Sequence, residues 1–213
     1  MFATFIDFKK AFDSINRDMM FAILRHYGIP EKIVKVIRTI YEHSTSRVFV
    51  DGILSEEFKT NTGVLQGDVL APFLFIIVID YVMRNSEDSF VFVTHLQEGT
   101  RSRVQKPERK LNDLDYADDI ALLESTLERA QHQLERTSSE ASKVGLEINV
   151  DKTKMMIIGA PLYGPYQTIS LNGEYIEVVR NFKYLGSMMA TAGGDMRARK
   201  GQAWGAFWKL KSI

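Results

Sequence analysis

The sequence has no cysteine among its 213 residues. This absence excludes disulfide bridges and thiolate zinc sites, and it fits a protein of a reducing compartment. Long apolar runs are also missing, because the most apolar stretch, APFLFIIVIDYVMR at 71–84, contains Asp80 and is too short to span a bilayer. The first residues, MFATFIDFKKAFDS, carry charge too early for a secretory signal. We therefore expect an intracellular protein, cytoplasmic or nuclear, without a membrane partner.

A net charge is missing too, since 27 basic residues balance 27 acidic ones. Overall neutrality by itself argues against a nucleic-acid binder, but the charges are segregated along the chain. From Arg180 onward, basic residues outnumber acidic ones seven to one, whereas acids dominate between Asp113 and Glu135. This segregation indicates either a basic surface for phosphate and an acidic pocket for metal, or two solvated faces of opposite sign.

The composition is that of a globular protein, with 45% hydrophobic and 25% charged residues. Periodicity and turn signals predict an α+β fold, an antiparallel sheet with helices on one face. The expected elements are strands at 2–7 and 147–159, helices at 16–28, 31–41, 73–84, 125–145 and 196–213, and hairpins at 47–60, 114–123 and 168–178. The segment 97–110 is expected to be exposed and mobile, and 160–167 to be a loop.

Capping and turn residues set several of these boundaries. Asn16 is expected to cap one helix, and Ser125 with Glu128 forms a capping box for another. Asp51-Gly52 and Asn172-Gly173 predict tight hairpin turns. Pro30 opens another helix, which is predicted from apolar residues that recur at helical spacing: Ile33, Val36, Ile37, Ile40 and Tyr41.

Two adjacent carboxylates, Asp118 and Asp119, interrupt the apolar segment LDYADDIALL at 114–123. An Asp-Asp pair is common in turns, because aspartate bonds its own backbone and tolerates turn conformations. Here the apolar flanks place both acids at the edge of a core, where repulsion and desolvation oppose them. A third acid, Asp7, ends a strand that would lie beside this hairpin. A bound cation would offset the repulsion.

Five segments occur in an order that resembles a known family. FIDFKKAFDS at 5–14, QGDVLAP at 66–72 and YADD at 116–119 resemble the palm of reverse transcriptases, most closely the non-LTR, LINE-type retrotransposon enzymes. GLEINVDKTK at 145–154 and FKYLG at 182–186 are similar to the fourth and fifth palm motifs of that family. The resemblance implies a reverse-transcriptase-type palm and RNA-directed DNA polymerase activity on an RNA template, a DNA primer and dNTPs.

The same resemblance implies a metal site. Nucleotide addition uses two divalent cations roughly 3.5–4 Å apart, and hard cations prefer carboxylate oxygens. Asp7 and Asp118 are implied as the main ligands of two Mg²⁺ ions, with Mn²⁺ an alternative, and Asp119 as a supporting acid. Lys152 matches a lysine that donates a proton to departing pyrophosphate, or it is an ordinary exposed lysine. Asp13 is expected to be a structural acid.

Other matched positions imply contacts with substrates. Phe12 stands where the family closes off the sugar 2′ position, or it is a core residue. Gln66 and Gly67 match the loop beneath the nascent base pair, although Gln66 also suits a loop brace. Lys9 and Lys10 would meet triphosphate or template unless they are merely solvated. The primer-grip-like residues are Lys183, Tyr184, Leu185 and Gly186, of which Tyr184 also suits core packing, and Tyr116 would support the hairpin.

The resemblance also divides the chain. Residues 1–160 are expected to form the palm, with the helix and hairpin of 28–65 toward the fingers side. Residues 161–189 would hold a hairpin and the primer-grip-like segment, and 190–213 the start of a thumb or connector helix. Upstream finger motifs, an endonuclease domain and the rest of a thumb are expected in a larger polyprotein.

Three functions remain open on the sequence. The first is a polymerase core, which the retained acids favour. The second is a catalytically silent retroelement remnant that persists as a folded or nucleic-acid-binding module, which the lack of finger motifs favours. The third is an unrelated α/β phosphotransferase with an acidic metal pocket, which explains neither Phe12 nor QGDVLAP. Maturase-like and telomerase-like relatives share the palm as well.

Overall fold

The computed structural model describes residues 1–86, 92–94, 109–111, 113–159, 168–189, 200–201 and 204. The expected segments 97–110, 160–167 and 196–213 therefore lie mostly outside the described residues. The helices are α1 (Ala11–Ser14), α2 (Arg17–His26), α3 (Glu31–Glu42), α4 (Ala71–Ser86) and α5 (Leu127–Lys143). In the described parts, no helix is long and apolar enough to cross a membrane.

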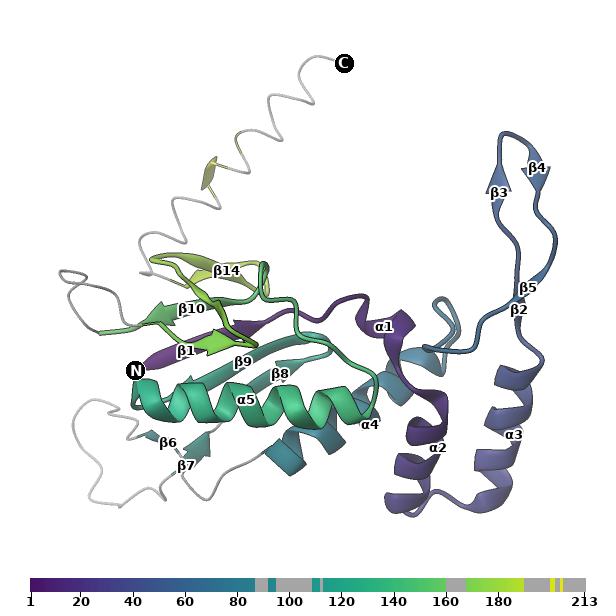
Figure 1. Cartoon of the computed structure of the whole chain (residues 1–213), viewed down its shortest axis with the longest axis horizontal. Helices are drawn as coiled ribbons and strands as arrows, with labels where there is room; N and C mark the ends of the chain where they lie inside the picture. The colour runs from purple at the N-terminus through teal and green to yellow at the C-terminus, as the bar shows by residue number, and fades with distance from the viewer. Residues whose placement is uncertain are drawn as a thin grey trace.

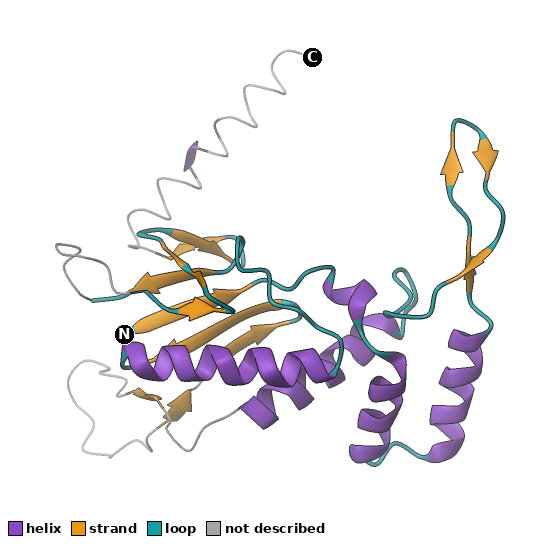
Figure 2. Cartoon of the chain, in the orientation of Figure 1, coloured by secondary structure: helices purple, strands orange, loops and turns teal. Residues whose placement is uncertain are grey.

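A five-stranded sheet lies at the centre of the fold, in the order β13-β10-β1-β9-β8 (Figures 1 and 2). Its strands are β1 (Phe2–Ile6), β8 (Asp113–Tyr116), β9 (Asp119–Glu124), β10 (Lys154–Ile157) and β13 (Glu177–Val178). All neighbours run antiparallel except β10 and β13, which are parallel. The expected antiparallel sheet is thus corrected to a mixed one, because the chain turns back after β12 before it pairs with β10.

The remaining described strands form small two-stranded ladders. They pair β2 (Thr45–Ser46) with β5 (Phe58–Lys59), β3 (Phe49–Val50) with β4 (Ile53–Leu54), β6 (Phe92–Thr94) with β7 (Arg109–Leu111), β11 (Ser170–Leu171) with β12 (Glu174–Tyr175), and β14 (Phe182–Tyr184) with β15 (Ser187–Met189). The predicted turns at Asp51-Gly52 and Asn172-Gly173 are confirmed, since both residues of each pair have positive φ.

Each face of the central sheet is covered by a different layer. On β9, Ile120 and Leu122 belong to the main core with helices α4 and α5, which run along the sheet in Figure 1. The alternate residues Ala121 and Leu123 belong to a second core with Tyr184 of β14. The α+β prediction with helices on one face holds, and the β14–β15 hairpin packs on the other face.

The N-cap of helix α5 lies one residue later than expected. Thr126 is its N-cap, with an extended backbone and a hydroxyl that accepts a hydrogen bond from the Arg129 backbone N–H at 3.3 Å. The Ser125–Glu128 capping box was therefore wrong, because the Ser125 hydroxyl instead accepts a hydrogen bond from the Arg129 guanidinium at 3.1 Å. The Asn16 cap of α2 is confirmed by its bond from the Met19 N–H.

Residues 45–59, here called the arm, form the β2–β5 and β3–β4 ladders and extend away from the sheet beyond α3 (Figure 1). Arg17 of α2 holds the base of the arm, because its guanidinium donates hydrogen bonds to the carbonyls of Thr60, Gly63 and Tyr41. The helix predicted after Pro30 is confirmed as α3, in which Val34, Ile37 and Tyr41 are buried, whereas Ile33, Val36 and Ile40 are exposed.

Two glycines allow close contacts beside the sheet. A Cβ on Gly63 would lie 2.6 Å from the Phe12 carbonyl oxygen, and one on Gly145 would lie 2.5 Å from the Ser14 carbonyl oxygen. Both glycines also have positive φ, a conformation that other residues seldom adopt. The loop before α4 and the end of α5 therefore both pack directly against the α1 region.

Candidate active site

The three candidate metal-binding acids lie at one end of the central sheet. Asp7 directly follows β1, the 117–118 turn joins β8 to β9, and Asp119 is the first residue of β9. Because Ile6 pairs with Ile120, the antiparallel register places Asp7 next to Asp119. Residues that are more than a hundred positions apart in the sequence thus meet at the same edge.

The surroundings of Asp119 disfavour the negatively charged form of its carboxyl group. Burial, then the neighbouring Asp118 and Asp7 carboxylates, raise the pKa of Asp119 above its usual value. In the turn, Ala117 has a φ of 57°, in the left-handed region where an L-residue is strained. Like charges and a strained backbone at one turn are features that cluster at functional sites.

Lys152 lies beside the first acid. Its ammonium Nζ is 3.6 Å from Asp7 Oδ1, an oxygen that is shielded from solvent and has no hydrogen-bond partner in the described part of the chain. The contact brings together two residues that the sequence assigned to one site from segments 145 positions apart. A carboxylate oxygen without a hydrogen-bond partner is a suitable ligand for a hard cation.

As they stand, no three His, Cys, Asp or Glu side chains of the described residues form a group ready to hold a metal ion. The convergence of Asp7, Asp118 and Asp119 on one pair of ions therefore stays a prediction. The donor chemistry fits such ions, since all three residues offer carboxylate oxygens and Asp7 Oδ1 lacks a hydrogen-bond partner.

Two of the residues assigned to the nucleotide, Phe12 and Gln66, contact other parts of the protein. Phe12 stacks on Phe75 of α4 with ring centroids 4.3 Å apart, which confirms that it contacts the core. The Gln66 amide donates a hydrogen bond of 2.8 Å to Asp13 Oδ1, so Gln66 braces the loop and Asp13 is its structural acceptor. Gly67 has a φ of 90° and nothing within 4 Å of a Cβ position. Contacts of these residues with a nucleotide stay predictions.

Lys9 is engaged within the protein. Its ammonium donates a hydrogen bond of 2.6 Å to Glu147, and this bond raises the pKa of Lys9. Both side chains are exposed, so the ion pair contributes little to stability. The assignment of Lys9 to a nucleotide remains a prediction that requires this pair to open.

The primer-grip-like hairpin contacts both acid-bearing strands. Phe182 stacks on Phe5 of β1 at 4.2 Å, and the Tyr184 hydroxyl lies 2.8 Å from the Leu114 carbonyl oxygen and 3.0 Å from that of Asp119. Tyr184 is buried, which confirms the core-packing alternative. The tip, Leu185-Gly186, has positive φ at both residues, and Lys183 is exposed. The side chain of Tyr116 lies outside the described part of the chain.

Sequence reasoning missed three residues that support the site. The Asn149 N–H donates to the Asp7 carbonyl oxygen at 2.8 Å, and the Asp7 N–H donates to Thr153 Oγ1 at 3.3 Å. Asn149, Thr153 and Phe182 were all part of quoted motifs but had no assigned role. No local signal marks these contacts, because each depends on the pairing of strands distant in sequence.

The comparisons with known proteins identify the family of this chain. The family model described as "Reverse transcriptase (RNA-dependent DNA polymerase)" matches residues 1–189. By its description, this family is a nucleotide-polymerising class of protein. The chain belongs to the reverse transcriptase family, and its relatives are of the non-LTR retrotransposon type.

Three relatives illustrate the similarity. The Pol polyprotein of the type-2 element R2DM from Drosophila melanogaster is 34% identical over 69% of this chain and 13% of its own length. That of a type-1 element R2 from Popillia japonica is 26% identical over 88% and 30%. The RNA-directed DNA polymerase from the mobile element jockey of D. melanogaster is 26% identical over 85% and 19%. The chain thus spans less than a third of each relative.

Proposed function

We propose that this chain is the palm core of an RNA-directed DNA polymerase, which adds dNTPs to the 3′ end of a DNA primer on an RNA template. The observation that carries the proposal is the β1–β9 register, which brings Asp7 beside Asp119 at the edge that also holds Lys152. The similarity to polymerases of retrotransposable elements supports the same reaction.

The carboxylates of Asp7 and Asp118 would hold two Mg²⁺ ions, with Asp119 in a supporting position. When bound, the ions would activate the primer hydroxyl and neutralise charge on the triphosphate. The β1–β9 ladder ends at the Ile6–Ile120 pair, next to both Asp7 and Asp119, so it would limit reorganisation of these two residues during the reaction. Mn²⁺ would fit the same oxygen ligands.

Other residues would orient the substrates. Lys152, beside Asp7, would donate a proton to pyrophosphate as it leaves. Phe12, held by its stack on Phe75, would close off the sugar 2′ position and favour dNTPs. The backbone of Gly67 would approach the nascent base pair, since nothing in the described chain lies near its Cβ position. Residues 183–186 would hold the primer end.

Primer extension on an RNA template with Mg²⁺ tests this proposal. The variant Asp118→Ala should lower the extension rate about 100-fold or more, because a lost metal contact removes several kcal/mol of transition-state stabilisation. Asp18→Ala is the matched control: it removes an exposed carboxylate that pairs with Arg38 on α2 and α3, and extension should stay within about twofold.

The same assay decides between the polymerase and the silent remnant. Extension that is absent at every protein and cation concentration, in a chain with a cooperative melt, would refute the polymerase. The lack of a ready ligand group among the described residues is the observation that favours the remnant. Binding of an RNA–DNA duplex without extension would then support a nucleic-acid-binding module.

A further inference from the structure

The turn that carries Lys152 is bonded to the backbone of Asp7 on both sides. Asn149 donates its N–H to the Asp7 carbonyl oxygen, and Asp7 donates its own N–H to the Thr153 hydroxyl. Within the turn, the Thr153 N–H donates to the Asn149 carbonyl oxygen at 2.9 Å, and the Lys152 N–H to Asn149 Oδ1 at 3.4 Å. The Lys152 backbone is therefore fixed relative to Asp7.

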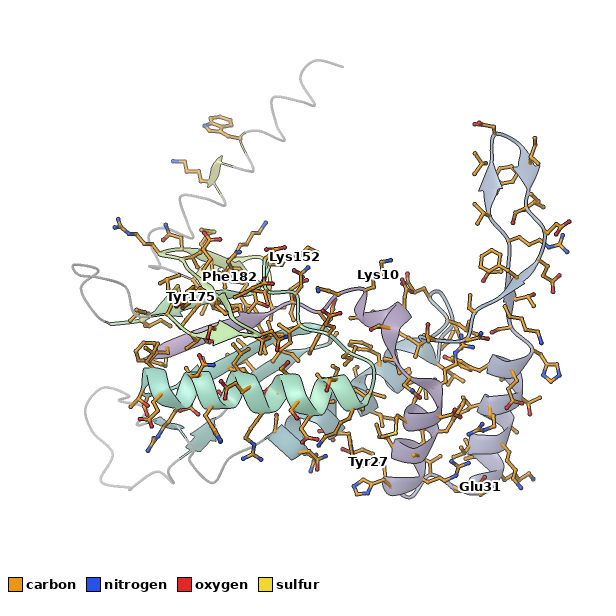
Figure 3. All side chains as sticks on the ribbon, viewed as in Figure 1. Lys10, Tyr27, Glu31, Lys152, Tyr175 and Phe182 are labelled. Carbon is orange, nitrogen blue, oxygen red and sulfur yellow. The ribbon has the colours of Figure 1, made fainter. Side chains whose placement is uncertain are left out.

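The Lys152 side chain, in contrast, is held loosely. Its exposed fraction is 66%, and its ammonium meets Asp7 Oδ1 at 3.6 Å, beyond hydrogen-bond distance. Figure 3 shows Lys152 on the same side of the sheet as Phe182, well away from Tyr27 and Glu31 at the far ends of α2 and α3. An exposed ammonium on a fixed backbone can leave one partner and reach another without moving the fold.

The charges around it explain why the ammonium lies there. Asp7, Asp118 and Asp119 bring three negative charges to one edge, and Lys9, two residues after Asp7, is engaged with Glu147. A positive charge near these carboxylates lowers their mutual repulsion. A divalent cation at the same oxygens would do so more strongly, because its charge is doubled.

We propose that Lys152 is the counter-ion of Asp7 in the metal-free protein, and that its ammonium leaves Asp7 when a divalent cation binds the carboxylates. This inference rests on the proposed function and adds to it the order in which the cation and the lysine act. Lys152 becomes available to the leaving pyrophosphate only after the carboxylates have bound their cation. The lysine and the cation are therefore competitors for Asp7.

The competition predicts how charge at this position changes cation affinity. Lys152→Met removes the positive charge but keeps most of the stem, so the dissociation constant for Mn²⁺ should fall about two- to fivefold, the range of one weak ion pair. Lys152→Arg keeps the charge and should stay within about twofold of the unmodified chain. Lys143→Met removes a distant charge, paired with Glu140 on α5, and should change nothing.

Titration of the metal-stripped full chain with Mn²⁺, with free Mn²⁺ followed by electron paramagnetic resonance, measures these constants without any catalysis. Thermal melts of each variant establish that it is folded, and Asp118→Ala identifies binding at this site by its loss. Tighter binding in Lys152→Met alone supports the proposal. Unchanged or weaker binding in that variant overturns it and leaves the polymerase proposal intact. If the unmodified chain binds no Mn²⁺ that depends on Asp118, both proposals fail.

Discussion

The central sheet and the arm are both built from short strands joined by tight turns, but they differ in what covers them. In the sheet, both faces are packed, by α4 and α5 on one side and by β14–β15 on the other. In the arm, the apolar residues are exposed on both strands of the tip, as Ile53 is at 73%. Exposed apolar residues continue onto the outer side of α3.

This difference shows that the pattern of apolar residues predicts where a strand forms, but not whether that strand is buried. The stretches FATFI and RVFVDGIL read equally as strands, and both form strands. Burial depends on which other elements return to cover each strand, and these are distant in the sequence. The acid-bearing strands β1 and β9 lie where coverage is complete, so the candidate site rests on the rigid region.

The largest expected effect compares two isoleucines on strands. Ile120 of β9 is 0% exposed, so Ile120→Ala should lower the free energy of unfolding by about 2–5 kcal/mol. Ile53→Ala in the arm should change it by less than about 0.5 kcal/mol. Urea unfolding of both variants measures the difference. Equal losses would break the comparison, because they would mean that the arm packs as part of the core.

Two glycines with similar φ sharpen the comparison next. Gly145→Ala introduces a Cβ 2.5 Å from the Ser14 carbonyl oxygen, whereas nothing lies within 4 Å of a Cβ on Gly52 in the arm. Both variants carry the same backbone strain, so steric overlap should make Gly145→Ala about 1–3 kcal/mol more destabilising than Gly52→Ala. Chemical denaturation tests this. A Gly52→Ala variant as unstable as Gly145→Ala would contradict a freely extended arm.

Local signals in the sequence predicted much of the fold correctly. Asn16, Asp51-Gly52 and Asn172-Gly173 act within a few residues of the chain, and the structure confirms each. The predictions that failed concerned residues that compete for one position, or strands that are distant from each other in the sequence. Thr126 replaced Ser125 as a cap because two neighbouring hydroxyls compete for one position. The parallel β10–β13 pair has no local signal at all.

The candidate site shows the same division between features that the sequence predicts and features that depend on distant pairing. Motif order identified the family, which the match over residues 1–189 confirms. The motifs predicted that Lys152 and Asp7 belong to one site. They did not predict the hydrogen bonds that hold the two residues close together. Asn149 and Thr153 bond to Asp7 only after β1 and β10 have paired, so their roles could not be read from residue types.

A third variant tests how the arm is joined to the rest of the molecule. Arg17→Met removes the guanidinium that donates to the Thr60, Gly63 and Tyr41 carbonyls and should cost about 2 kcal/mol, because hydrogen bonds to charged groups are the stronger ones. Arg47→Met, which removes a pair with Glu57 on the arm's surface, should cost less than about 1 kcal/mol. Hydrogen exchange at the base of the arm should rise in Arg17→Met only.

The smallest expected effect lies in the covered region, where one hydroxyl is exchanged for hydrogen. Tyr184→Phe keeps the ring on Phe5 but removes the bond to the Leu114 and Asp119 carbonyls, which should cost about 0.5–1.5 kcal/mol and speed amide exchange of β9. Tyr175→Phe, at a residue 77% exposed, should change neither. If β9 exchanges no faster in Tyr184→Phe, the hairpin merely covers the sheet. Faster exchange would mean that the primer-grip-like hairpin holds the strand that carries Asp119, and so links the proposed primer contact to the proposed metal site.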